Sequence, residues 1–161
     1  YLGEQLPAST RYSDAGMALP ATPAEVDDAS LARMRQLILD TLDNPTQLAQ
    51  WFGRAMTQPK YVDQLIPAEH PTDVEALVAE LQAGEVLVHS LGSRFAWRDL
   101  GNGNATLFVD GDAIECALPL AQAIAAAQLD AGILEHEEAA MLLGALLDGG
   151  SLAWLDDEED A

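Results

Sequence analysis

Cysteine is almost absent from this sequence, and so are long apolar segments. Cys116 is the single cysteine among 161 residues, so the chain cannot close an internal disulfide. Apolar residues never continue for the roughly 18 positions that a membrane-spanning helix needs, and no segment has the pattern of a secretory signal. We therefore expect a soluble protein of a reducing compartment, cytoplasmic and without a membrane partner.

Basic residues are also scarce, and the C-terminal part has none. The chain holds 7 Lys and Arg against 27 Asp and Glu, which gives a formal net charge of −20. Arg98 is the last basic residue, and the 63 residues after it contain 14 acids. Such a charge repels phosphate, which argues against nucleic acid as a partner. The change in charge also indicates two regions, joined near the proline-containing stretch 60–71.

Apolar residues are numerous enough to build a core. They make up 49% of the sequence, and the mean hydropathy is +0.03, well above the range of unfolded acidic chains. A chain of 161 residues predicts one domain of ordinary size or two small ones. Because Tyr1 stands where a translation start would have Met, we expect the chain to be part of a longer protein.

The first region predicts an extended arm and then a helical hairpin. Residues 1–27 contain three prolines and little periodicity. Asp27 or Asp28 can cap a helix, and Asn44-Pro45 is typical of the start of the next one. The two helices carry more apolar surface than they can bury on one another, which predicts a dimer interface. The candidate interface residues are Leu31, Met34, Leu37, Ile38, Leu42, Leu48, Trp51 and Phe52.

The second region predicts an α+β unit with a small antiparallel sheet. Thr72-Asp73-Val74-Glu75 has the spacing of a capping box, and Gly84 suits the C-terminal cap of the helix that follows. Strands are expected within 85–116, broken at Gly92-Ser93 and by two-residue turns at Asn102-Gly103 and Asp110-Gly111. Helices are expected after Pro119 and over 135–148, and a last strand over 151–155. This order is typical of a winged-helix-like domain.

No motif in the sequence predicts catalysis or metal binding. His70, His89 and His136 lack a second ligand at a spacing that would bring two side chains to one metal. Cys116 has no basic neighbour in the sequence and acids around it that would raise its pKa, so we interpret it as a core thiol. Gly101-Asn102-Gly103 and Asp110-Gly111-Asp112 are interpreted as turns, because neither is followed by the ligands of a phosphate or calcium loop.

Five consecutive acids, residues 156–160, end the chain ahead of Ala161. One interpretation is a solvated tail that keeps the domain soluble. The other is an electrostatic attraction for a basic partner such as a ribosomal protein.

Three segments together resemble a known family. They are Arg11-Tyr12-Ser13-Asp14, then Asn44-Pro45 through Gln50-Trp51-Phe52-Gly53, then residues 82–88 with the sequence QAGEVLV. In order and spacing they are similar to the C-terminal half of the bacterial Jumonji-C, cupin-like ribosomal oxygenases. Those enzymes use Fe(II) and 2-oxoglutarate to hydroxylate an arginine of a large-subunit ribosomal protein.

The resemblance implies a domain plan without a catalytic centre in this chain. Residues 1–27 would be an arm leaving a missing catalytic barrel, 28–66 a helical dimerisation region, 67–155 a winged-helix-like domain and 156–161 an acidic tail. The residues that bind iron and 2-oxoglutarate would lie in the missing barrel, so this chain would have no catalytic, cofactor-binding or metal-binding residue and no oxygenase activity alone. The implied partners are a second copy of the chain and a basic ribosomal protein.

Two other readings stay open at this stage. The chain could be a free-standing acidic winged-helix adaptor that binds protein or nucleic acid. An enzyme in its own right would need a site that the sequence does not show.

Overall fold

The structure, a computed structural model, describes residues 15–16, 26–60, 65–126 and 128–155. Two compact units divide the chain, Tyr1–Phe52 and Gly53–Ala161. The expected acidic tail lies outside the described residues, as does the arm apart from 15–16 and 26–27. The expected division of the chain into arm, dimerisation region, winged helix and tail therefore stays a prediction.

In the first unit, local capping places the helix starts. Helix α2 (Asp28–Leu42) begins after Asp27, whose carboxylate accepts a hydrogen bond from the Ser30 backbone N–H at 2.8 Å. The Asn44 side-chain oxygen accepts from the N–H groups of Thr46 and Gln47, both at 3.1 Å, and α3 (Pro45–Thr57) follows. Of the two expected caps for the first helix, Asp27 is therefore the one used, and the Asn44-Pro45 start is confirmed.

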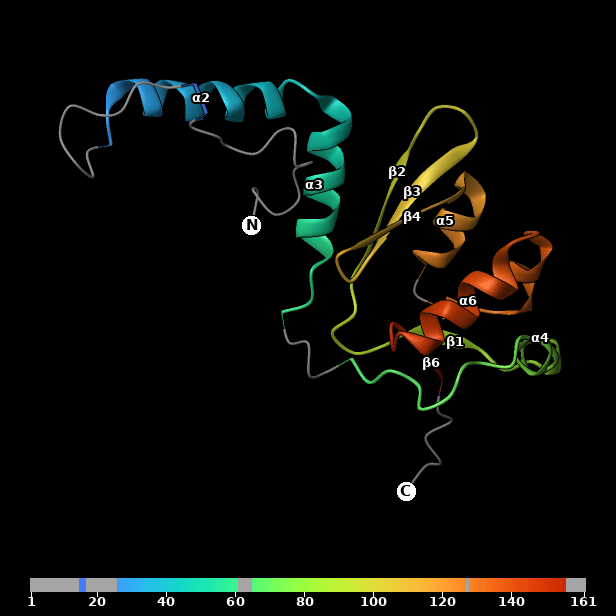
Figure 1. The fold of residues 1–161 in the computed structure, drawn as a ribbon. Helices are drawn as coiled ribbons and strands as arrows, with labels where there is room; N and C mark the ends of the chain where they lie inside the picture. Colours follow the sequence, from blue (N-terminus) through green and yellow to red (C-terminus); the bar gives the residue numbers. More distant parts are fainter. Residues whose placement is uncertain (1–14, 17–25, 61–64, 127, 156–161) are drawn as a thin grey trace. The chain divides into compact units, whose positions relative to one another are not determined.

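The second unit alternates short helices and strands (Figure 1). In chain order they are α4 (Val74–Ala83), β1 (Leu87–His89), β2 (Phe95–Asp99), β3 (Asn104–Val109), β4 (Asp112–Ala117), α5 (Leu118–Ile124), β5 (Gln128–Leu129), the 3₁₀ helix η3 (Ala131–Glu135), α6 (Ala139–Asp148) and β6 (Leu152–Trp154). The α+β class with small antiparallel sheets is confirmed.

Two antiparallel three-stranded sheets form the frame of this unit. One has the order β5-β1-β6 and the other β2-β3-β4. Helix α5 lies against the second sheet (Figure 1), and α4 packs with α6 and η3. The core between them is aliphatic, and its largest fully buried members include Leu77, Leu81, Leu107, Leu120 and Leu143.

The turn at Asp110-Gly111 is confirmed as a two-residue hairpin. Val109 pairs with Asp112, and both turn residues have positive φ, 51° and 94°. Positive φ at both positions matches the right-handed twist of the flanking strands. Aspartate is one of the few non-glycine residues that tolerate it.

The expected two-residue turn at Asn102-Gly103 is wrong. The β2–β3 connection spans residues 100–103, and positive φ occurs at Gly101 and Gly103 but not at Asn102. Two side-chain oxygens shape this longer loop. Asp99 accepts from the Gly101 N–H at 2.7 Å, and Asn102 accepts from the Asn104 N–H at 3.1 Å.

The expected capping box is wrong as well. The carboxylate of Asp73, not the Thr72 hydroxyl, accepts from the N–H groups of Glu75 and Ala76 and caps α4. The N–H and hydroxyl of Thr72 both donate to Asp148 at the end of α6, at 2.7 and 2.6 Å. The Thr72 hydroxyl, which the local pattern assigned to the cap of α4, therefore donates instead to a charged carboxylate on a distant helix. Gly84, at φ 106°, is confirmed as the C-cap.

The expected helix over 135–148 is shorter than predicted. Residues 131–135 form η3, His136 is extended at φ −89° and ψ 125°, and α6 begins only at Ala139. Ile133 and Ala139 are both buried, yet one continuous α-helix would point side chains six residues apart in different directions. The break at His136 lets both reach the core.

Candidate functional site

An apolar face runs along α2. Leu31, Met34, Ile38 and Leu42 follow one another at intervals of three or four residues, which places them on one side of the helix. Their exposed fractions are 55%, 41%, 41% and 44%. Large hydrophobic side chains that share one face and remain this exposed are the kind of surface that binds a partner. Leu37, also a predicted interface residue, is partly buried.

On α3 the predicted residues differ in burial. Leu48 and Trp51 are partly buried, whereas Phe52 is 55% exposed. Met56, one turn after Phe52, is exposed to the same extent. The residues predicted for the dimer interface therefore include exposed ones on both helices, and their role in dimerisation stays a prediction.

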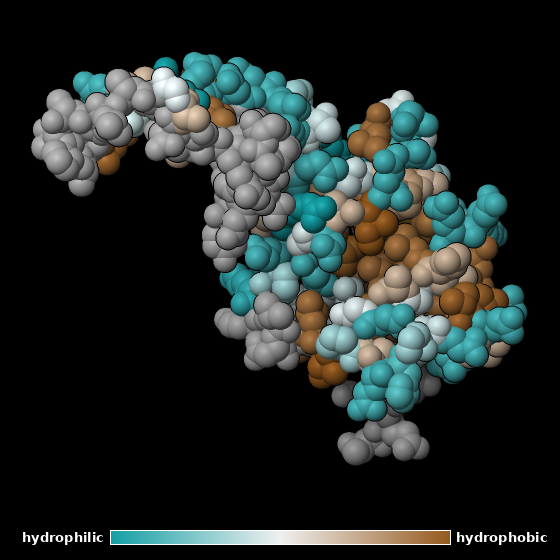
Figure 2. All heavy atoms as spheres, in the orientation of Figure 1, coloured by the Kyte–Doolittle hydropathy of each residue, from teal (hydrophilic) through white to brown (hydrophobic). Residues whose placement is uncertain are grey.

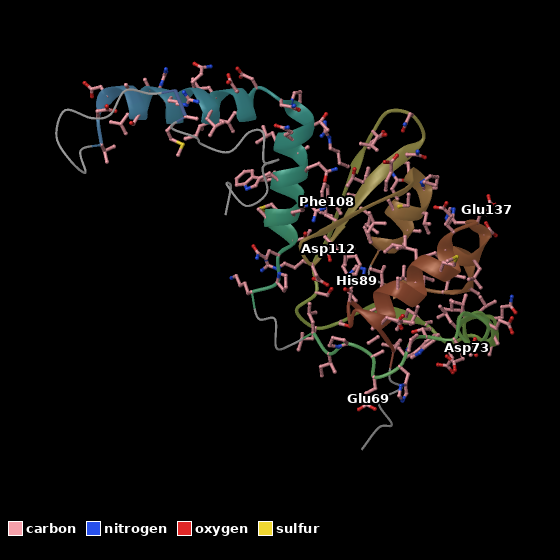
Figure 3. All side chains as sticks on the ribbon, in the orientation of Figure 1. Glu69, Asp73, His89, Phe108, Asp112 and Glu137 are labelled. Atoms are coloured by element: carbon pink, nitrogen blue, oxygen red, sulfur yellow. The ribbon has the colours of Figure 1, made fainter. Side chains whose placement is uncertain are left out.

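An acidic cavity of about 550 Å³ lies beside β4 and the segment before α6. Glu115, Glu135, Glu137 and Glu138 line it, together with His136. Figure 3 shows Glu137 on this segment, directed away from the core. Lys and Arg are absent from the lining, so the cavity suits a cationic group and not a phosphate.

Cys116 is a buried thiol that contributes to the lining of this cavity. Burial raises its pKa above the ordinary value, and the negative charges of Glu138 and Glu115 raise the pKa further. Because the thiolate is the reactive form, this environment makes Cys116 inert. The interpretation as a core thiol is confirmed.

His89 has a structural role in β1. Its Nε2 is 2.8 Å from the carbonyl oxygen of Ile124, and its ring stacks on Phe95 with centroids 3.8 Å apart.

Within the described ranges, no cluster of three or more His, Cys, Asp or Glu side chains could hold a metal ion. The described residues therefore offer no ligand set that fits Fe(II). No helix among the described residues is long and apolar enough to cross a membrane.

Asp110 links segments in a way that sequence reasoning missed. Beyond its place in the turn, its carboxylate accepts from the Ser93 hydroxyl, from the Arg94 N–H at 2.8 Å and from the Ser151 hydroxyl at 2.7 Å. The β3–β4 turn is thereby tied to the loop before β2 and to the loop before β6. No local pattern signals such a connection, because the partners are distant in the sequence.

A second, more apolar cavity lies between β4 and α6. It measures about 410 Å³, and Val109, Ile114 and Leu146 contribute to its lining. Figure 2 shows hydrophobic side chains gathered on the second unit where the β2-β3-β4 sheet, α5 and α6 meet.

Comparison with known proteins identifies the fold. Residues 36–153 match the ROXA-like winged helix. The chain belongs to this family. The ROXA-like winged helix accounts for both sheets and for α4 to α6, so the winged-helix expectation is confirmed.

The relatives of this ROXA-like winged-helix chain are ribosomal oxygenases. The ribosomal protein uL16 3-hydroxylase of Escherichia coli K12 is 31% identical over 83 residues, which are 52% of this chain and 22% of the relative. The structure of the E. coli ribosomal oxygenase YcfD with cobalt and 2-oxoglutarate has a TM-score of 0.65 and 26% identity, covering 90% of this chain and 40% of that one.

A further X-ray structure of E. coli YcfD has a TM-score of 0.63 and 27% identity, covering 89% of this chain and 39% of that one. The match falls on the C-terminal part of YcfD. The chain therefore spans about two fifths of the length of these solved relatives. The resemblance to the ribosomal oxygenases is confirmed.

Proposed function

We propose that this chain is the non-catalytic assembly part of an Fe(II)- and 2-oxoglutarate-dependent ribosomal protein arginine hydroxylase. The match of residues 36–153 to the ROXA-like winged helix carries the proposal, supported by the likeness of 90% of the chain to part of a ribosomal oxygenase. In this proposal iron and 2-oxoglutarate bind a catalytic domain outside this chain, which itself supplies dimerisation and contacts with protein.

The proposed lack of catalytic activity can be tested with the chain itself. Incubated with Fe(II), 2-oxoglutarate and oxygen, it should turn over no 2-oxoglutarate, and calorimetry should detect no saturable binding of 2-oxoglutarate in the presence of Fe(II). Tight binding or succinate release would contradict the proposal and favour an enzyme in its own right.

Dimerisation is proposed through the apolar face of α2, with a second copy of the chain as the occupant. The support is that Leu31, Met34, Ile38 and Leu42 stay exposed along the whole helix. Burying such side chains contributes about 1.5–3 kcal/mol each when burial is complete. In a two-fold dimer the same surface patch of each copy contacts that of the other, so one exposed apolar face is enough to form the interface.

Sedimentation equilibrium tests this interface. The chain should be dimeric at tens of micromolar, and Met34→Glu or Ile38→Glu should shift it to monomer. The matched control is Ala29→Glu, which adds the same charge on the opposite side of α2, at an exposed position in its first turn. A strictly monomeric chain, or a dimer that Met34→Glu and Ile38→Glu leave intact, would contradict this part of the proposal.

The second proposed contact is between the acidic winged-helix domain and a basic ribosomal protein. The support is the lack of Lys and Arg after Arg98 and the four glutamates around the larger cavity. Binding of purified uL16 can be measured by calorimetry at two salt concentrations. Glu137→Gln with Glu138→Gln should weaken binding several-fold, whereas Glu80→Gln with Glu85→Gln, an equal charge change elsewhere on the domain, should not. Binding of duplex DNA instead of uL16 would favour the adaptor reading.

A further inference from the structure

The last turn of α3 lies against the β2-β3-β4 sheet, and the contacts all fall inside the second unit. Gly53 faces the ring of Phe108, so closely that a Cβ on residue 53 would lie 2.4–2.5 Å from three ring carbons. Contacts this short do not occur between real side chains. Glycine at residue 53 is therefore what lets the helix backbone rest on the aromatic ring.

Two further residues of this turn bind the β3–β4 hairpin. The Thr57 hydroxyl, on a side chain that is almost fully buried, donates to the Gly53 carbonyl at 2.9 Å and accepts from the Gly111 N–H at 3.1 Å. The Arg54 guanidinium donates to the Gly111 carbonyl at 3.1 Å and lies 3.7 Å from the Asp112 carboxylate. Figure 3 shows Phe108 and Asp112 beside the end of α3.

The hairpin that receives this turn is itself fixed. Asp110 holds it through Ser93 and Arg94 in the loop before β2 and through Ser151 in the loop before β6. The hairpin that residues 53–58 contact is therefore held by hydrogen bonds that do not involve those residues.

The burial of Phe108 is separate from that of the main core. Ala105, Leu107 and Val109 on the same strand belong to the core cluster, but Phe108, 3% exposed, does not. Successive residues of a strand point to opposite faces, so Phe108 lies on the outer face of the sheet, where Gly53 meets it. The contacts of residues 53–58 can consequently be lost while the core stays packed.

We propose that residues 53–58 are a latch: they close over Phe108 and the β3–β4 hairpin, and open as one unit without unfolding the winged-helix domain. Parts of a native protein held by few buried contacts open at lower free energy than the core. This inference goes beyond the proposed function and needs neither dimerisation nor an oxygenase.

Amide hydrogen exchange of the full chain, followed by NMR, tests the latch. The reporter is the Gly111 N–H, because its hydrogen bond to the Thr57 hydroxyl exists only when the latch is closed. In the unmodified chain Gly111 should exchange at least 10-fold faster than Leu107, whose amide lies in the core strand, and with a weaker dependence on denaturant. Equal exchange of the two amides, with equal denaturant dependence, would overturn the proposal.

Variants separate the latch from general destabilisation. Thr57→Val, which keeps the shape and removes the hydroxyl, should speed exchange at Gly111 by 10-fold or more and leave Leu107 unchanged. Arg54→Met provides a second variant at a partly exposed site, for use if Thr57→Val fails to fold. Thr46→Val, exposed in the first turn of the same helix, is the matched control and should change neither amide. Unchanged Gly111 exchange in both latch variants would overturn the proposal.

Discussion

The ring of Phe108 occupies the space that any side chain on residue 53 would need, since three of its carbons lie within 2.4–2.5 Å of the position of a Cβ there. Gly53 stands inside a helix, where glycine is ordinarily unfavourable. The contact with Phe108 explains its presence.

Gly53→Ala should therefore destabilise the chain. Helix propensity alone would favour alanine by about 1 kcal/mol, whereas overpacking against an aromatic ring costs about 1–3 kcal/mol. We expect a net loss in the free energy of unfolding, measured by urea denaturation. Ala55→Gly, at an exposed position two residues on, measures the propensity of this helix without the contact. If Gly53→Ala stabilised the chain instead, the Phe108 ring would be able to move away from residue 53 without lowering the free energy of unfolding.

Two residues of α6 should respond very differently to truncation. Leu143 is fully buried and Met141 is 77% exposed. Leu143→Ala should lower the free energy of unfolding by about 2–5 kcal/mol, because it removes buried methyl groups and leaves a cavity. Met141→Ala should change it by less than about 0.5 kcal/mol. Similar losses in thermal denaturation would mean that Met141 is covered in solution, for example by a partner.

Asp148, the last residue of α6, should contribute more to the free energy of unfolding than a residue at a helix end usually does. It receives both the N–H and the hydroxyl of Thr72, at 2.7 and 2.6 Å. Asp148→Ala should cost about 2–3 kcal/mol, as expected for hydrogen bonds to a charged group. Thr72→Val removes the hydroxyl bond alone and should cost less, while Asp73→Ala, which removes the α4 cap, should cost about 1 kcal/mol. An effect of Thr72→Val larger than that of Asp148→Ala would contradict this assignment.

Cys116 should lower stability at alkaline pH. Burial, with Glu138 and Glu115, raises its pKa in the folded chain, so the unfolded chain releases its proton first as the pH increases. Its contribution is complete below the ordinary thiol pKa and is lost as the pH rises through that value toward the raised one. As the pH rises above the ordinary thiol pKa of about 8.5, the free energy of unfolding should therefore fall more steeply for the unmodified chain than for Cys116→Ala. Identical slopes would contradict the raised pKa.

Alkylation offers a direct view of the same thiol. The buried Cys116 should react with iodoacetamide at neutral pH much more slowly in the folded chain than in urea. Equal rates in the two states would show that the larger cavity admits the reagent to the sulfur.

Local signals were sufficient wherever the deciding groups are close in sequence. The sequence correctly predicted the helix start at Asn44-Pro45, the C-cap at Gly84 and the turn at Asp110-Gly111. Each of these features is formed by atoms of neighbouring residues. The capping box failed for the opposite reason. Thr72 had a better acceptor 76 residues away, which no window of sequence contains.

The candidate site was accessible to sequence reasoning only in part. The acidic character of the C-terminal region and the apolar spacing on α2 are properties of composition and period, and both could be read directly. The sequence did not indicate that the helix is interrupted at His136, or that His136 lines the larger cavity together with glutamates. The interruption depends on the tertiary structure, because Ile133 and Ala139 both pack into one core. Which exposed residues bind a partner stays a prediction.

The amino-acid sequence by itself determined the α+β class, the family resemblance, the starts of α2 and α3 and the Asp110-Gly111 turn, since these depend on periodicity, charge and short-range hydrogen bonds. The tertiary structure alone decided which side of β3 contacts Gly53, why residue 53 is glycine, and where Thr72 and Asp110 bind. These contacts form between residues that meet only after the chain has folded, and their free energy comes from close packing and desolvated hydrogen bonds that no local pattern encodes.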